Sequence, residues 1–134
     1  MLETYSTNIT VADNTAIPFN NVNISKGCTA ILAGPATVQL NKCGVYMISC
    51  DASLAPTAAG EIGIQLSKNG ILQPQAQSVS TGTADSYDAL SFTTLVQVAE
   101  NNTCSCCTSP TTIQVINSIE SDYAIASITV TKIC

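Results

Sequence analysis

Apolar and polar positions alternate with a period of two along much of the chain, the pattern of strands that bury one face. The alternation is clearest at the start of 61–73, where Ile62, Ile64 and Leu66 are separated by glycine and glutamine. The dipeptide Asn69-Gly70 follows and supplies the positive φ angles of a tight hairpin turn. This segment is therefore predicted to form a β-hairpin.

Six further segments are predicted to be strands. In the segment 43–54, Tyr46, Ile48 and Cys50 share one face. The predicted strands outside the hairpin are 17–25, 37–40, 43–54, 90–100, 111–118 and 123–133. Turn residues recur between them at short intervals, and no segment has the pattern of a long helix. About eight short strands in a single domain over 1–134 predict an all-β antiparallel sandwich or jelly roll.

The composition indicates that a partner covers part of the surface. Hydrophobic residues make up 46% of the 134 residues, and charged residues only 10%, where about 25% is usual for a soluble domain. A partner subunit is the simplest cover for so apolar a surface.

The missing residue types exclude several functions. The chain has no histidine and no arginine, four lysines and a net charge of −5, so it lacks the cationic face that nucleic acids require. Without histidine, a serine or cysteine nucleophile has no usual base, and without arginine the usual phosphate clamp is missing. We predict that the protein is not an enzyme and needs no cofactor. The polar N-terminal stretch predicts no signal peptide, no transmembrane segment and no membrane partner.

Seven cysteines leave at least one thiol unpaired or paired between chains. Three of them, Cys104, Cys106 and Cys107, fall within four positions. We predict a turn between strands that carries thiols or a disulfide, with no catalytic role. Disulfides between loops or chains remain an alternative. So does a metal site shared between subunits, although a structural zinc site usually takes four ligands in two spaced pairs.

Two acidic pairs have simple explanations. Asp85 with Asp88, and Glu120 with Asp122, could bind calcium or act as acid and base, but neither spacing matches a calcium loop. Both pairs are predicted to be solvated loop charges.

Several pieces of the sequence, taken in order, resemble a known family. They are the opening "ITVADNTAIPFNN", "CGVYMISCDASL" with Gly44 and Tyr46 in a Gly-x-Tyr pattern, "IGIQLSKNGILQPQAQS", "LSFTTLVQVAENNTCSCC" and the closing "YAIASITVTKI". Together they resemble the tumour-necrosis-factor/complement type of trimeric jelly roll, in its bacterial and phage branch, over nearly the whole chain. The resemblance implies an all-β antiparallel jelly-roll sandwich that assembles as a homotrimer.

The resemblance also implies a function. Spore-surface relatives carry a Gly-x-y collagen stalk before this domain, whereas here the first strand follows Met1 almost at once. Short, stalkless domains of this kind resemble phage capsid decoration or head-fibre proteins. We therefore expect a virion protein, made in the host cytoplasm, whose partners are itself and a major capsid protein or another virion protein. The alternatives are a receptor- or glycan-binding tip of a phage fibre and a bacterial spore or exosporium surface protein.

The resemblance also suggests which residues contact another subunit, and the N-terminal segment is a candidate for docking. Scarce aromatic residues in a β protein usually anchor the core, but the resemblance places some of them along the three-fold axis. It implies Tyr46, Phe92 and Ile128 as the subunit contact. Residues 1–7 precede the first clear strand and are a candidate docking arm.

Overall fold

The computed structural model describes residues 1–27, 29–98 and 111–133. These residues form ten strands in two five-stranded antiparallel sheets. The strands are β1 (Leu2–Val11), β2 (Asn21–Ser25), β3 (Ala30–Leu32), β4 (Val38–Leu40), β5 (Gly44–Pro56), β6 (Gly60–Lys68), β7 (Ile71–Gly82), β8 (Asp88–Val98), β9 (Thr111–Asn117) and β10 (Ser121–Lys132).

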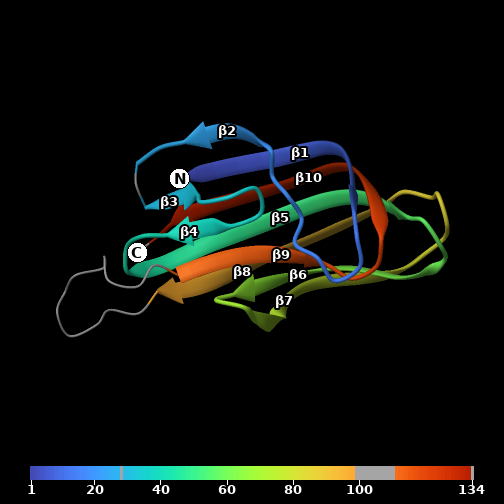
Figure 1. The fold of residues 1–134 in the computed structure, drawn as a ribbon. Helices are drawn as coiled ribbons and strands as arrows, with labels where there is room; N and C mark the ends of the chain where they lie inside the picture. The colour runs from blue at the N-terminus through green and yellow to red at the C-terminus, as the bar shows by residue number, and fades with distance from the viewer. Residues whose placement is uncertain (28, 99–110, 134) are drawn as a thin grey trace.

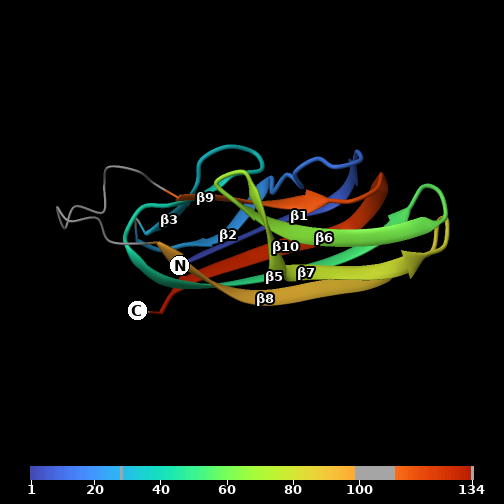
Figure 2. The same ribbon diagram turned by 90° about the horizontal axis from the view of Figure 1, so that it is seen from below.

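The two sheets pack face to face as the layers of a sandwich (Figures 1 and 2). The first sheet has the strand order β2-β1-β10-β5-β8, and the second has the order β3-β4-β9-β6-β7. The strands run along the length of the molecule, and their connecting turns gather at its two ends. The prediction of an all-β antiparallel jelly roll is confirmed.

The core lies between the sheets and contains the predicted alternating residues. Ile62, Ile64 and Leu66 of β6 are buried, as are the corresponding side chains of β5 in the other sheet. Each fully buried aliphatic side chain contributes about 1.5–3 kcal/mol of hydrophobic stabilisation. The hairpin between β6 and β7 has φ angles of 51° at Asn69 and 84° at Gly70, as the sequence predicts.

The N-terminal segment, residues 1–7, does not precede the first strand but, from Leu2 onward, forms part of it, and its role as a docking arm stays a prediction. Residues 2–7 belong to β1, which pairs with β10 on one side and β2 on the other. Leu2, Thr4 and Ser6 are buried. The strand was not predicted because two of these inward positions are small and polar, so the usual apolar signal is missing. The segment is therefore part of the first sheet.

Other strand boundaries also differ. The predicted strand 17–25 begins only at Asn21, and Ile17 and Phe19 are buried in the connection before it. The strand β3 was not predicted, and β7 continues to Gly82, beyond the predicted hairpin. Among the described residues, no helix is long and apolar enough to span a bilayer.

Candidate functional site

Charge is separated along the long axis of the sandwich. One end, called here the lysine end, holds the N-terminus, the start of β5 and the ends of β6 and β10 (Figure 1). It carries all four lysines, Lys26, Lys42, Lys68 and Lys132. The opposite end, called the acidic end, carries six of the eight described carboxylates, namely Asp13, Glu61, Asp85, Asp88, Glu120 and Asp122. No lysine lies at the acidic end.

A buried amide organises the turns of the acidic end. Asn117, the last residue of β9, is fully buried, and its Nδ2 donates to the carbonyl oxygens of Val11, Ala12 and Ile119 at 2.6–3.1 Å. Its Oδ1 accepts a hydrogen bond of 2.6 Å from the hydroxyl of buried Tyr123. One side chain thus joins the end of β1 to the turn between β9 and β10.

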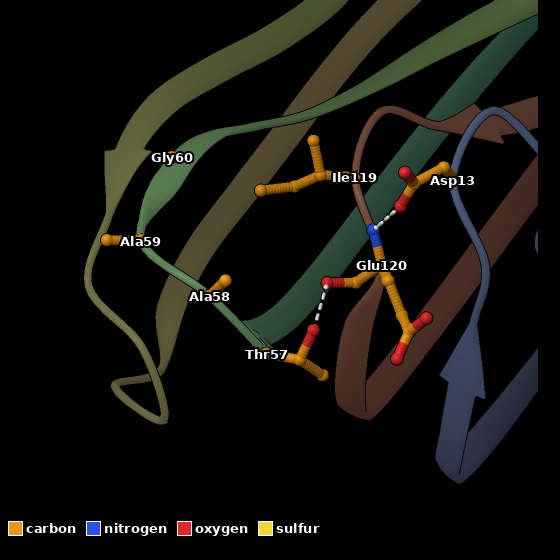
Figure 3. A pocket seen from close by; sticks show the side chains of 7 residues that line it. All are labelled: Asp13, Thr57, Ala58, Ala59, Gly60, Ile119 and Glu120. Atoms are coloured by element: carbon orange, nitrogen blue, oxygen red, sulfur yellow. Dashed lines mark hydrogen bonds between the residues drawn. The ribbon is translucent and has the colours of Figure 1, made fainter.

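That turn forms one side of a pocket with a volume of about 360 Å³. The pocket is lined by Asp13, Thr57, Ala58, Ala59, Gly60, Ile119 and Glu120 (Figure 3). The backbone of Glu120 is held on both sides, since its N–H donates to Asp13 Oδ1 and its carbonyl accepts from the N–H of Thr57 at 3.2 Å. The Glu120 carboxylate extends away from the Asp13 carboxylate. The pocket therefore combines two carboxylates with an aliphatic wall.

Sequence reasoning did not find this pocket. Its lining comes from three turns that lie far apart in the sequence, and alanine, glycine and threonine carry no distinctive motif. Of the predicted acidic pairs, Glu120 lines the pocket, and Asp122 accepts a hydrogen bond of 2.6 Å from Thr10. Asp85 lies in the exposed turn before β8. Among the described residues, no group of three or more histidine, cysteine or acidic residues could hold a metal ion.

The predicted subunit contact residues lie inside a single chain. Tyr46 is 0%, Ile128 1% and Phe92 8% exposed, and all three belong to the core. The Tyr46 hydroxyl donates to the carbonyl oxygen of Lys42 at 2.6 Å. These side chains have almost no exposed area left to bury against another subunit. The outward-facing residues of the same strands are therefore the candidates for a subunit contact.

The outer face of the first sheet is nearly uncharged. The strand register aligns its outward residues in rows across β1, β10, β5 and β8, and about half of them are serine or threonine. Glu3, Asp51 and, at the acidic end, Asp122 are the charged residues among the outward positions of these rows. Met47 and Leu95 form a cross-strand pair, 40% and 58% exposed, and Ile125 is 45% exposed. Small side chains with isolated apolar ones allow close approach of another protein surface.

The predicted cysteine cluster, Cys104, Cys106 and Cys107, lies outside the described residues. Of the two described cysteines, Cys43 is disulfide-bonded and Cys50 is free and buried in the core. Burial, together with the neighbouring Asp51 carboxylate, raises the pKa of the Cys50 thiol to about 12. Cys50 is therefore a core residue and not a reactive thiol.

Comparison with solved structures identifies the fold. The globular domain of a zebrafish complement 1qA protein superposes with a TM-score of 0.74 at 9% identity, covering 99% of this chain and 96% of that one. The Eiger TNF of S. frugiperda gives 0.73 at 10% identity, covering 99% and 92%. The chain has the TNF and complement 1q jelly-roll fold. The resemblance inferred from the sequence is thus confirmed at the level of fold.

A further structural neighbour is the PRD1 vertex protein P5, with a TM-score of 0.55 at 18% identity, covering 99% of this chain and 96% of that one. No family model matches the sequence. No curated protein matches it either. At these identities, the comparisons establish the TNF-like fold and leave the function to be argued from the surface of this chain.

Proposed function

We propose that this TNF-like chain is a structural protein of a virion, a homotrimeric decoration or head-fibre protein on the capsid surface. There it stabilises the shell or presents a host-facing surface. Two observations support the proposal. One of the structural neighbours is a vertex protein by name. The chain also combines a nearly uncharged lateral face with strongly charged ends, as expected of subunits that pack side by side and dock end-on.

The observation that carries the proposal is the outer face of the first sheet. A subunit packed there would cover Met47, Leu95 and Ile125 and desolvate few charges, so most of the buried apolar area contributes at about 25 cal/mol per Å². A stable interface needs roughly 1,000 Å² or more. Trimerisation on this face accounts for a composition with 46% hydrophobic and 10% charged residues.

Particle binding would follow from shape and copy number. Three chains place three identical ends side by side, so that contacts of modest individual strength act together. No chemical step is required, in agreement with a chain that has no histidine and no arginine.

Light scattering on the purified chain tests the trimer. We expect a molar mass of three times the 13.9 kDa of one chain. The substitution Leu95→Lys places a charge in the proposed contact and should yield monomers. The control Val79→Lys changes a residue of similar exposure, 56%, on the outer face of the second sheet and should leave the trimer intact. A monomeric wild-type chain would contradict the proposal.

Mass spectrometry of density-gradient fractions from the culture that encodes the chain tests the location. Peptides that co-migrate with the major capsid protein are the expected result. Peptides confined to spore or cell-envelope fractions would instead favour a bacterial surface protein. A trimer found at the distal tip of a tail fibre would favour the receptor- or glycan-binding alternative.

A further inference from the structure

The lining of the pocket at the acidic end suits both the apolar stem and the charged group of a long basic side chain. Ala58 and Ala59 line one side of it and Ile119 faces them, while Asp13 and Glu120, whose carboxylates point in different directions, lie on the side of Ile119 away from the alanines (Figure 3). Lysine and arginine place their methylene stems along apolar surface and keep the charged group where it can be paired or solvated. Asp13 and Glu120 are both exposed, so a cationic group gains a charge pair there that a neutral or anionic group does not.

The Glu120 carboxylate is available to such a group. Among the described residues, no hydrogen bond or ion pair reaches it, whereas Asp13 already uses one oxygen to accept from the Glu120 N–H. The Glu120 backbone is fixed from both sides by Asp13 and Thr57, and the turn itself is bound to buried Asn117. A turn fixed in this way loses little backbone freedom on binding.

The pocket is also kept open by a small residue. A Cβ atom at Gly60 would lie 3.3 Å from Ile119 Cδ1, so any larger residue would crowd the aliphatic wall. The volume of about 360 Å³ falls within the range of small-ligand sites. The pocket can therefore accept one side chain from outside.

The surrounding charge favours the same occupant. The six carboxylates of the acidic end, with no lysine among them, attract a basic surface and orient its approach. In a trimer the three acidic ends would face the same way and multiply this attraction. The lysine end would be repelled by the same partner.

We infer that the protein docks on its particle through the acidic end, with a lysine or arginine side chain of the capsid surface in this pocket. The inference rests on the proposed function, because it specifies which end of the virion protein makes the contact. It also defines the partner by its chemistry, as a basic protruding side chain beside a cationic surface.

The test measures binding of the purified chain to particles stripped of it, by co-sedimentation over a concentration series. Glu120→Gln removes the free carboxylate without changing its size, and Ala58→Trp fills the pocket without changing charge. Both should weaken binding at least about tenfold. Glu61→Gln makes the same charge change at the same end but outside the pocket, and should weaken binding less than about twofold. Binding of the wild type should also weaken as salt rises from about 50 to 500 mM.

The outcomes separate the two claims. Weak binding by Glu120→Gln and Ala58→Trp, with near-normal binding by Glu61→Gln, supports the pocket. Equal losses for Glu61→Gln and Glu120→Gln would overturn it in favour of a diffuse field, and so would variants that bind like the wild type; the proposed function stands in both cases. A wild-type chain that does not bind the particles would overturn the proposed function and this inference with it.

Discussion

The two ends of the sandwich carry opposite charge, and each is built around a buried tyrosine. At the lysine end, the hydroxyl of Tyr46 donates to the carbonyl oxygen of Lys42, in a turn near the surface. At the acidic end, the hydroxyl of Tyr123 donates to Asn117, which in turn binds three backbone carbonyls inside the protein. The acidic end is thus held by a buried network around one amide, whereas at the lysine end the Tyr46 hydroxyl bridges two backbone carbonyls, those of Lys42 and Thr29.

The net charge of −5 does not describe how charge is distributed over the molecule. The outer face of the first sheet carries few charges, the carboxylates of Glu3, Asp51 and Asp122, so lateral packing has to desolvate few of them. The ends differ in sign, so they select partners of opposite chemistry. A rigid network under the acidic end preorganises that surface for binding.

The largest expected effect is loss of the buried amide. Asn117→Ala leaves the Tyr123 hydroxyl without its acceptor and removes one donor from each of three backbone carbonyls, of which Ala12 and Ile119 keep a hydroxyl donor. It should lower the free energy of unfolding by about 3–4 kcal/mol. Urea denaturation measures the change. Asn23→Ala, which removes only an exposed hydrogen bond to Glu3, should cost less than about 0.5 kcal/mol. Equal losses would show that the acidic end has no special network.

Packing at the acidic end should be intolerant of added volume. A Cβ atom at Gly82 would lie 2.8 Å from Pro56 Cγ and 2.9 Å from Ile62 Cγ2. We expect Gly82→Ala to destabilise the fold by about 1–3 kcal/mol, because neither neighbour is a flexible chain end. Gly34→Ala meets nothing within 4 Å and should be close to neutral. Thermal denaturation of the two variants provides the check, and a neutral Gly82→Ala would contradict this packing.

The two tyrosines allow a direct comparison of the ends. Tyr123→Phe leaves the buried Oδ1 of Asn117 unpaired and should cost about 1–3 kcal/mol. Tyr46→Phe removes the hydroxyl that donates to the carbonyls of Lys42 and Thr29. Water can reach the carbonyl of exposed Lys42, so the loss should be about 0.5–1.5 kcal/mol. Chemical denaturation of both variants measures which one loses more free energy of unfolding. A larger loss of stability for Tyr46→Phe would show that the lysine end, and not the acidic end, depends more on its tyrosine hydroxyl.

The smallest expected effect, about 0.8 kcal/mol at pH 9, is a loss of stability at alkaline pH. The Cys50 thiol has a pKa of about 12 in the folded chain and about 8.5 when unfolded. Between these values the unfolded state releases a proton that the folded state keeps, so stability is complete below about pH 8.5 and falls as the pH rises. The fall approaches about 1.4 kcal/mol per pH unit for this group.

Denaturant titrations at a series of alkaline pH values test this with Cys50→Ala, which should show a shallower fall than the wild type. Burial also raises the pKa of Tyr46 and Tyr123, so a residual slope persists in the variant near and above pH 10. Identical slopes for both proteins would show that the thiol is not buried in solution.

The sequence predicts the core of this protein better than its surface. The alternation around Ile62 and Tyr46 identifies the buried faces of β6 and β5, because side-chain period and burial are directly linked. It does not reveal β1, whose inward residues include Thr4 and Ser6. Nor does it reveal the pocket, since Asp13, Ala58 and Glu120 come together only through the fold. Because side chains alternate along β5, a buried Tyr46 implies that its neighbour Met47 faces outward. The expected subunit contact therefore moves from Tyr46 to Met47.

Cryo-electron microscopy of the gradient-purified particle band tests the central claim most directly. The account predicts copies of this chain on the capsid around three-fold axes. In that arrangement the outer faces of the first sheets, with Met47 and Leu95, meet laterally, and the acidic ends contact the shell. A particle without the chain, or one that carries it as isolated monomers, would contradict the account.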